Sequence, residues 1–590
     1  MIKDKILKNL ELTLKKLNIK DVTATLEKPA NSDFGDYSSS LPLKLTKQLK
    51  KNPMIIAEEI KNNFPKTEFI KKIEIVKPGF INFWIADQIL VSNVNNLLKN
   101  DVYGKTSLLN NKKIIIEFTD PNPFKEFHIG HLYSNVVGES ICRIFEANEA
   151  IVRRVCYQGD VGLHVAKSLW GLNKKMEIDK IIFKNLEEKT LEEKIEYLGQ
   201  SYALGASVFE EDEKAKKEII KLNKQVYDKD NKIKEIYDKC KQWSLDYFES
   251  IYQRLGTNFQ EYYFESAVGK IGLLLVEEYL KKGLFEKSKG AVIFPGEKYG
   301  LHSRVFINSL GLPTYEAKEL GLAPKKNEDW PYDESYIITA NEINEYFKVL
   351  IKVLTLISPD LGKKTHHIGH GIVKLPEGKM SSRTGKIITG EWLLNTAHKK
   401  SWDKIQETTK TKFKGSYAYF SSKAKVKPSL QWSTAEIIGV GAIKYAFLKQ
   451  SIGKDVVFNF DESINFEGNS GPYIQYAYVR CKSVLNKADF SNEAMKQLNN
   501  IKINVDESNV LRIINQFPEV VQQAAIQLAP NLIANYLYEL AQKYNYFYQK
   551  NKILESEETI KQFRLMLTQA TGKVIKEGLY LLGIKTVERM

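Results

Sequence analysis

Two histidines and a glycine in the stretch PNPFKEFHIGHLYS, residues 121–134, have a spacing that suits phosphate chemistry. His128 and His131 flank Gly130, and their imidazoles can donate hydrogen bonds to a phosphate that gains charge during a reaction. Gly130 has no side chain, so an adenine ring can lie flat against its backbone. The letters HIGH occur again at residues 367–370, and the surrounding sequence must therefore decide which copy forms a site.

The first copy follows the strand-like run EFTDPN and a turn with two prolines. It leads into a segment with apolar residues at helical spacing, namely Val136, Val137, Ile141 and Ile144. At a strand-to-helix turn, the first amides of the helix and its dipole attract phosphate. The second copy is followed by GIVKLPEGKM, which is strand-like. We therefore predict that the first copy forms the site and that the second is a coincidence of spelling.

A loop further along the chain, LPEGKMSSRTG at residues 375–385, carries cations and hydroxyl groups between two glycines. Such a loop can close over a triphosphate and stabilise charge on the leaving pyrophosphate. Alone, it is also compatible with a basic surface loop. Its residues of interest are Lys379, Met380, Ser381, Ser382 and Arg383.

The HxGH turn and this loop, in this order across an α/β region, resemble the two signatures of class I aminoacyl-tRNA synthetases. The resemblance implies ATP as a substrate, accompanied by Mg²⁺. The residues that it assigns to ATP are His128, Gly130, His131, Lys379, Met380, Ser381 and Ser382. It assigns catalytic roles to His128, His131, Lys379 and Lys125, and leaves open which lysine dominates at the phosphates.

The run EFTDPNPFKEFHIGHL is similar to the strand–loop signature of arginyl-tRNA synthetases. The likeness covers nearly the whole chain, through the segments SDFGDYSSSLPLKLTKQLKKNP, VCYQGDVGLHVA, GLPTYEAKELG, GNSGPYIQYAYVR and LGIKTVERM. The arginine-binding residues that it implies are Glu117, Asn122, Tyr315 and Glu319. The chemistry agrees, because a guanidinium needs planar carboxylate or amide partners and a buried carboxylate needs a cation opposite it.

Three positions depart from the family pattern. Glu319 stands where Asp is usual, and Val161 and His164 replace Trp and Gln. Plainer interpretations also exist: Glu319 could be a solvated helix residue and Tyr315 a core residue. Asp160, a candidate polar contact, could be an ordinary turn residue.

The elements that must position these residues follow from the hydrophobic pattern. The run KKIIIEFTDPN is apolar and ends in turn residues, as a buried parallel strand does. Helices and short strands alternate from there to about residue 390, as in a doubly wound α/β sheet. With the resemblance, this predicts a class I synthetase fold with a Rossmann-like parallel-sheet catalytic domain at 105–430 and a helical insertion at about 172–260. A small α/β N-terminal domain is expected at 1–104 and an all-helical C-terminal anticodon-binding domain at 431–590.

Net charge and cysteine usage indicate the kind of partner and the cellular compartment. The chain of 590 residues has a formal net charge of +15, which suits a polyanion such as nucleic acid, although no single stretch holds the excess. Its four cysteines lie far apart without metal-ligand spacing, so we expect reduced thiols in the cytoplasm, no metal site and no structural zinc. No apolar run is long enough to span a bilayer, so no membrane partner is expected.

The resemblance implies an arginine–tRNA ligase with L-arginine, ATP and tRNA(Arg) as substrates, acting as a monomer. L-arginine is activated to arginyl-adenylate and transferred to the 2′-hydroxyl of the terminal adenosine. The expected tRNA contacts are Tyr473, Gln475, Tyr476 and Arg480, since tyrosines stack on unpaired bases and arginine meets phosphate. Half of the tyrosines in this helix could instead be core residues.

Two other functions compete with this reading. A small-molecule nucleotidyltransferase also uses an HxGH turn, but it needs neither the N-terminal module nor the helical C-terminal domain. A catalytically idle, synthetase-like tRNA-binding protein would be free to lose His128, Gly130 and His131, which are intact here.

Overall fold

The computed structural model describes residues 1–590 except 30, 100–102, 377–387, 410–429 and 489–501. The chain divides into two compact units. The sheet unit comprises Thr106–Gln475, Ala524–Asn535 and Gly578–Met590, and the bundle unit comprises the three segments Met1–Lys105, Tyr476–Gln523 and Tyr536–Glu577. Each unit is therefore assembled from segments that are distant in the sequence.

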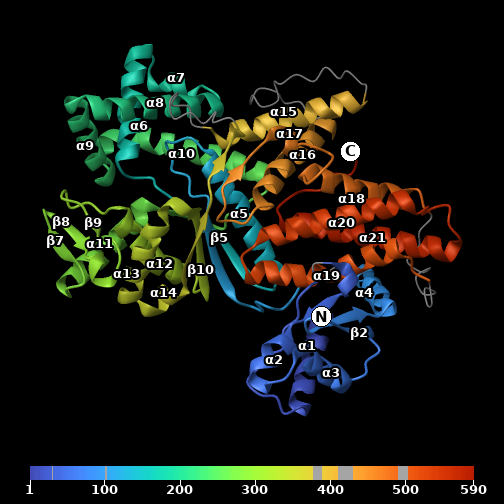
Figure 1. Cartoon of the computed structure of the whole chain (residues 1–590). Coiled ribbons are helices and arrows are strands. Elements are labelled where there is room, and N and C mark those ends of the chain that lie inside the picture. Colours follow the sequence, from blue (N-terminus) through green and yellow to red (C-terminus); the bar gives the residue numbers. More distant parts are fainter. Residues whose placement is uncertain (30, 100–102, 377–387, 410–429, 489–501) are drawn as a thin grey trace. The chain divides into compact units, whose positions relative to one another are not determined.

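A five-stranded parallel sheet forms the centre of the sheet unit (Figure 1). In spatial order its strands are β11 (Thr365–His370), β10 (Glu334–Ala340), β4 (Lys113–Phe118), β5 (Ile151–Gln158) and β6 (Glu261–Phe264). β4 comes first in the sequence but lies in the middle, so the chain moves outward through β5 and β6 and then, on the other side, through β10 and β11. Ligands of open α/β sheets bind where the strand order reverses, here outside the carboxyl ends of β4 and β10.

The sequence of β4 explains its central place. Ile114, Ile115 and Ile116 are each at most 1% exposed, because helices cover both faces of the sheet. Helix α5 (Ile129–Ala147) packs against β4, β5 and β10. Ile115 belongs instead to the hydrophobic core shared with α11 (Glu265–Lys281), α12 (Tyr315–Asp329), α13 (Asn344–Ile357) and the neighbouring α14 (Pro359–Lys364).

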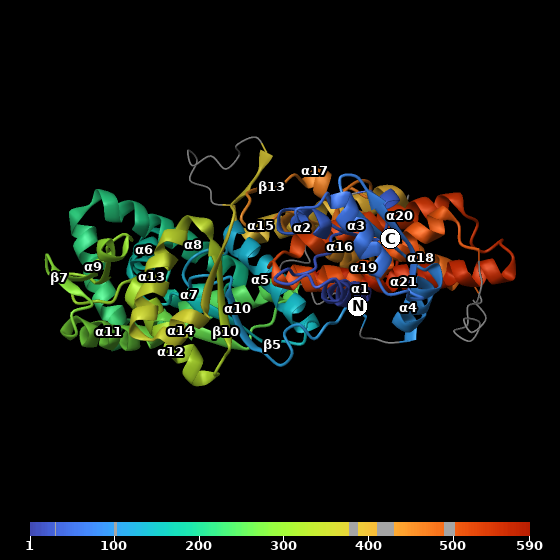
Figure 2. The same ribbon diagram turned by 60° about the horizontal axis from the view of Figure 1, so that its bottom comes forward.

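Two insertions enlarge the sheet unit (Figures 1 and 2). A helical block lies between β5 and β6 and consists of α6 (Leu163–Asp179), α7 (Phe183–Glu187), α8 (Leu191–Glu211), α9 (Glu213–Tyr227) and α10 (Asn231–Leu255). A small antiparallel sheet follows α11, made of β7 (Glu286–Ser288), β8 (Ala291–Phe294) and β9 (Arg304–Ile307), with a 3₁₀ turn at Gly296–Tyr299.

This small sheet differs from the continuous alternation of helices and parallel strands that the sequence pattern suggested. Lys289 and Gly290 both have positive φ, 49° and 81°, which is the backbone of a tight two-residue hairpin turn. Antiparallel pairing of β7 with β8 follows from that turn, so these strands cannot join the parallel sheet.

The sheet unit continues into helices. They are α15 (Gly390–Thr409), α16 (Leu430–Leu448), α17 (Phe460–Ser463) and the start of α18 (Gly471–Asn486), with a short parallel pair of β12 (Val373–Lys374) and β13 (Val456–Val457). A 3₁₀ turn at Asn341–Ile343 follows β10. None of the helices in the described part of the chain is both long and apolar enough to cross a membrane.

The bundle unit combines an α/β module with helices. The module contains α1 (Ile2–Lys16), a 3₁₀ turn (Ser32–Phe34), α2 (Leu41–Leu49), α3 (Pro53–Asn63), α4 (Asp87–Lys99) and an antiparallel sheet of β1 (Tyr37–Ser39), β3 (Phe80–Ile85) and β2 (Ile70–Val76). It packs against α19 (Val505–Ile526), where Arg512 pairs with Asp36 and Tyr37 donates to Glu519 at 2.5 Å. Helices α20 (Pro530–Lys550) and α21 (Glu558–Leu581) complete the unit with most of α18 (Figure 1).

Candidate active site

The first HIGH copy forms the start of α5, at the carboxyl edge of the parallel sheet. His128 is the N-cap residue, and its Nδ1 accepts hydrogen bonds from the backbone N–H groups of Gly130 (3.1 Å) and His131 (3.4 Å). In return, His131 Nδ1 accepts from the His128 N–H at 3.3 Å. The rings stack with centroids 3.5 Å apart. Each Nδ1 is therefore an acceptor, so the proton of each neutral ring resides on Nε2, which is left to donate.

Electrostatics keep both rings neutral. Burial, reinforced by the nearby Lys125, lowers the pKa of His128 to about 4. Burial, His128 and Lys125 lower the pKa of His131 well below its usual value. At neutral pH this turn therefore offers two Nε2–H donors and the first amides of a helix, a combination that binds phosphate oxygens.

The loop that leads into α5 has an unusual backbone. Thr119, Asp120 and Phe124 have positive φ values of 80°, 47° and 69°, a region that residues other than glycine rarely occupy. Hydrogen bonds hold this backbone in place, because the Thr119 N–H donates to Ser134 Oγ at 2.9 Å and the Phe124 N–H donates to Ser244 Oγ at 3.0 Å. Strain that is held by the surroundings in this way is typical of functional loops.

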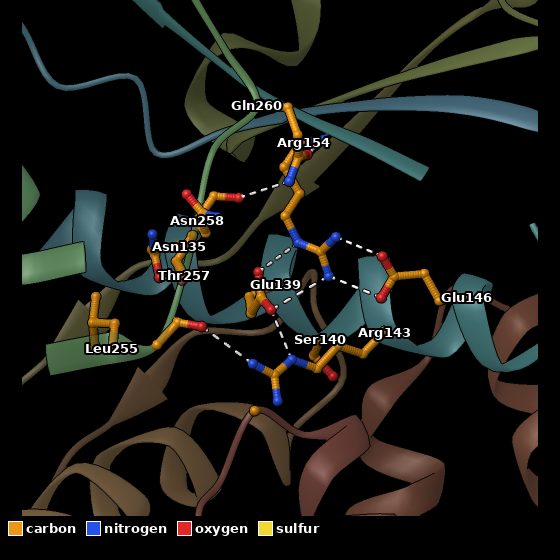
Figure 3. Close-up of polar contacts among 12 residues, drawn as sticks. Asn135, Glu139, Ser140, Arg143, Glu146, Arg154, Leu255, Thr257, Asn258 and Gln260 are labelled. Atoms are coloured by element: carbon orange, nitrogen blue, oxygen red, sulfur yellow. Dashed lines mark hydrogen bonds and ion pairs between the residues drawn. The ribbon is translucent and has the colours of Figure 1, made fainter. Parts of the chain in front are cut away.

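A network of ion pairs holds the second half of α5 in place (Figure 3). Glu139 accepts from Arg143 Nε at 2.7 Å and from Arg154 Nε at 2.9 Å, and Arg154 also donates to Glu146 through Nη1 (2.6 Å) and Nη2 (3.0 Å). Arg154 belongs to β5, so the network ties the helix that carries the two histidines to the sheet.

Buried carboxyl groups gather at the end of β4. Glu117, 1% exposed, accepts from Lys326 Nζ of α12 at 2.8 Å. Burial and the Glu117 charge raise the pKa of Asp120 and of Glu319 well above their ordinary values. Three carboxyl groups thus share one lysine, which makes this a site that attracts a further cation. Glu319 is half-buried, and burial and the Glu117 charge raise its pKa, so it is not the solvated helix residue that the sequence also allowed.

Asn122 lies beside this cluster but faces β5. Its Oδ1 accepts from the Gly159 N–H at 3.0 Å, and a Cβ placed on Gly159 would lie 2.4 Å from that oxygen, so only glycine fits. Glu265 is next to Gly159 and forms a buried pair with Lys318 of α12. Tyr315, at the start of α12, is 53% exposed, which excludes the core role that the sequence left open.

The segment after β5 contains the departures from the family pattern. Asp160 is fully buried and accepts from Lys241 Nζ (2.7 Å) and Ser266 Oγ (2.6 Å), so its carboxylate is bound within the chain. His164 Nε2 lies 2.8 Å from the Gly159 carbonyl oxygen, and burial lowers the pKa of His164 to about 4. Val161 is buried as well, so these side chains support the Gly159 backbone from behind.

Lys125 lies in the turn before α5 with its Nζ 5.0 Å from the centre of the Tyr202 ring. Arg383 and the ATP-binding candidates Lys379, Met380, Ser381 and Ser382 lie outside the described residues.

The second HIGH copy itself forms the end of strand β11, whereas the sequence had suggested a strand only for the residues that follow it. His366 contacts Glu334, and His367 stacks on Phe347 at 4.0 Å between ring centroids and lies 2.7 Å from Thr339 Oγ1. His367 also borders a pocket of about 680 Å³ with Lys348 and Lys352. No helix begins there, so these rings lack the helix amides of the first copy.

The residues proposed for tRNA contact behave differently from one another. Gln475 is fully buried and donates to the Lys585 carbonyl at 2.7 Å, so it is not available to a ligand. Tyr473 is half-buried, whereas Tyr476 is 37% exposed. In the bundle unit, the Arg480 guanidinium lies 4.9 Å from the ring centre of Tyr476 and 5.0 Å from that of Tyr548, which makes an aromatic and cationic surface.

Some site residues escaped the sequence analysis. Lys326 lies in the charged run KKNED and looks solvated, although its seven-residue spacing from Glu319 places both on one helix face. Gln158 ends β5, is fully buried, and has no hydrogen-bond partner for either amide atom among the described residues. Its position at the carboxyl end of a parallel strand was a usable signal.

The fold and the site together define a class I aminoacyl-tRNA synthetase. A Rossmann-like sheet carries a two-histidine helix start at its carboxyl edge, and the catalytic-domain model of the class I (R) tRNA synthetases matches residues 93–460. The arginyl tRNA synthetase N-terminal domain matches residues 2–85, and the DALR anticodon binding domain matches residues 474–590.

Comparison with individual proteins identifies the family within this class. An arginine–tRNA ligase of Halothermothrix orenii is 30% identical, and the alignment covers 100% of this chain and 99% of that protein. An arginine–tRNA ligase of Fusobacterium nucleatum is 31% identical, and the alignment covers 95% of this chain and 94% of that protein. The arginyl-tRNA synthetase of Thermus thermophilus superposes with a TM-score of 0.79 at 21% identity over the full length of both chains, and that of Plasmodium falciparum gives the same TM-score and identity over 100% and 99%. The chain belongs to the arginyl-tRNA synthetase family, and the predicted fold class is confirmed.

Proposed function

We propose that this chain is an ATP-dependent arginine–tRNA ligase. One observation carries the proposal: β4 and the loop after it bring together a cluster of buried carboxyl groups, which attracts a cation, and a pair of neutral imidazole donors. The cluster suits a guanidinium and the donors suit a phosphate. Family membership supports the same assignment.

In the first step, an oxygen of the arginine carboxylate attacks the α-phosphorus of ATP. A phosphorus–oxygen bond forms to give arginyl-adenylate, the bond to the β-phosphate oxygen breaks, and pyrophosphate leaves. We assign the Nε2–H groups of His128 and His131 to the phosphate oxygens that gain charge. Lys125, and Lys379 outside the described residues, would neutralise the departing phosphates, with Mg²⁺ entering as the ATP complex.

Arginine recognition is assigned to the carboxyl cluster and its neighbours. Glu117 and Glu319 would face the guanidinium, and Tyr315 would cover it from the exposed side. Asn122 and the unpartnered amide of Gln158 are suited to the polar groups of the amino-acid end. A site built from such groups rejects a neutral analogue such as citrulline, because it would leave buried carboxylates without a cation.

In the second step, the 2′-hydroxyl of the terminal adenosine of tRNA(Arg) attacks the activated carbonyl and AMP leaves. We assign anticodon contacts to Tyr476 and Arg480, with Tyr473 at the edge of that surface. The reduced, buried state of all four cysteines supports action in the cytoplasm, and we propose a monomer.

The test is charging of total tRNA with ATP and each amino acid in turn. Arginine alone should be charged, and His131→Ala should lower the rate roughly a hundredfold or more. Charging of tRNA with another amino acid would show that the assignment of the carboxyl cluster to arginine is wrong. Tight tRNA binding without any charging would favour the idle tRNA-binding protein, and nucleotidyl transfer without tRNA would favour the small-molecule enzyme.

A further inference from the structure

Lys326 is a buried cation to which the proposed reaction gives no role. It lies in the last turn of α12, is 1% exposed, and donates through Nζ to Glu117 Oε2 at 2.8 Å and to Ser335 Oγ at 3.2 Å. Although burial opposes the charge, Glu117 raises the pKa of Lys326 above its ordinary value. The side chain is therefore an ammonium held inside the protein.

A stabilising role alone explains this pair poorly. Taking two charges out of water costs about as much as their attraction returns, and apolar residues of similar size often serve stability equally well. The surroundings of the pair instead suggest a chemical role. Glu117 is the penultimate residue of the central strand, at the carboxyl edge where ligands of such sheets bind, and Lys326 reaches it from the side of Ser335, near the start of β10.

Lys326 also interacts unequally with the three carboxyl groups of Glu117, Asp120 and Glu319. It donates a hydrogen bond to Glu117 and reaches Asp120 and Glu319 only through space. Asp120 accepts a hydrogen bond from the Tyr157 N–H at 2.8 Å and contacts no lysine in the described part of the chain. Contact with an ammonium favours the ionised form of a carboxylate, whereas burial beside like charge favours the protonated form. Of the three groups, Glu117 is the one to which Lys326 gives a counter-charge by direct contact.

We propose that Lys326 is a positioning residue for arginine, which holds the Glu117 carboxylate in place through its hydrogen bond so that Glu117 can bind the substrate guanidinium. A carboxylate has about four acceptor positions, so a hydrogen bond to Oε2 leaves room for a second cation. Lys326 itself touches no substrate. The inference rests on the proposed arginine pocket and adds a residue that determines its charge.

The prediction concerns the pH dependence of arginine binding, so every titratable group around Glu117 matters. Those on its own strand loop, on β5, on α12 and on the segment between α12 and β10 are Asp120, Cys156, Tyr157, Glu319, Lys326 and Tyr332. Among these, only Lys326 is a cation, so its removal leaves the cluster without an internal counter-charge.

The experiment measures KM for arginine in tRNA charging between pH 6.5 and 8.5 for the wild type and for Lys326→Met, Lys326→Arg and Lys325→Met. Lys325 is the matched control, because it is the neighbouring residue but pairs at the surface with Asp329 at 2.6 Å. We expect Lys326→Met to raise KM for arginine roughly tenfold or more at pH 6.5 and less at pH 8.5, because the Lys326 charge lowers the pKa of Asp120 and Glu319 and its loss favours their protonated forms. KM for ATP should stay near the wild-type value in all variants, and Lys326→Arg should restore most of the arginine affinity.

If Lys326→Met fails to fold, the double variant Glu117→Gln/Lys326→Met decides, because it removes both members of the hydrogen-bonded pair together. It should fold and show a raised KM for arginine. A wild-type KM in the double variant, or in a folded Lys326→Met at every pH, would overturn the inference. So would equal losses in KM for arginine, KM for ATP and kcat, since those indicate a purely structural pair. A wild type that does not charge arginine would instead overturn the proposed function itself.

Discussion

Replacement of Arg154 by Met tests whether the ion-pair network of Figure 3 holds α5 to the sheet. Arg154 is buried and donates to Glu139, whose side chain is 4% exposed, and to Glu146, whose side chain is 34% exposed. Loss of one partner from a buried pair costs about 3–5 kcal/mol. Because Glu139 keeps Arg143 and Glu146 is partly solvated, we expect the lower end, about 3 kcal/mol. For a unit of this size, that corresponds to a fall in Tm of about 3 °C.

Thermal unfolding of the full chain, followed by circular dichroism at one fixed scan rate, measures this shift. Arg153→Met is the matched control, since Arg153 is the adjacent strand residue and its guanidinium makes a cation–π contact with Trp330 at 5.1 Å but no described carboxylate contact. We expect the control to lower Tm by less than about 1 °C. Equal Tm values for Arg154→Met and Arg153→Met would refute the reasoning that the buried network anchors α5.

Three further predictions follow from the site and the bundle unit. The pKa of His164 is about 4 in the folded chain and higher in the unfolded chain, so the unfolded chain binds more protons between these values and stability falls as pH drops from about 6.5 to 4. His164→Gln should therefore reduce the loss of Tm between pH 7 and 5, and an unchanged dependence of Tm on pH would contradict this. Glu319→Gln should raise KM for arginine roughly tenfold without changing KM for ATP, measured by tRNA charging, and an unchanged KM for arginine would remove Glu319 from the pocket. Arg480→Met should raise KM for tRNA roughly fivefold while arginine saturation is unaffected, and a normal KM for tRNA would mean that the surface with Tyr476 does not bind RNA.

The helix start at the first HIGH copy and the central strand could be predicted because local sequence determines them. An apolar run of three isoleucines fits only a strand covered on both faces, and a histidine at each end of the first helical turn fits the reciprocal capping observed at His128 and His131. The fold class followed from these elements and from the resemblance. The small sheet β7–β9 was missed because short apolar strands look alike whether they pair in parallel or through a hairpin.

The partners inside the site could not be predicted, because they come from distant parts of the chain. Glu117 and Lys326 are 209 residues apart, and the charged run around Lys326 is typical of a solvated helix end. In α18, helical spacing separates two faces but does not indicate which face is covered. Gln475 therefore looked as accessible as Tyr476, and only the structure distinguishes them.

Residues 578–590 belong to the sheet unit, although they begin in the last turn of α21, a helix that otherwise belongs to the bundle unit. The Leu581 carbonyl accepts from Ser140 Oγ of α5 at 2.9 Å, the Gly583 carbonyl from Lys444 Nζ at 2.6 Å, and the Lys585 carbonyl from Gln475 Nε2 at 2.7 Å. A ribosome makes these carbonyl groups more than a hundred residues after Gln475. The buried donor Ser140 must therefore wait for its acceptor, and Lys444, which also donates to the Leu255 carbonyl, for its second one, until the later bundle segments have been made. Nascent chains halted before residue 580 should accordingly be readily bound by chaperones and cleaved by proteases, because the sheet unit then lacks its last segment.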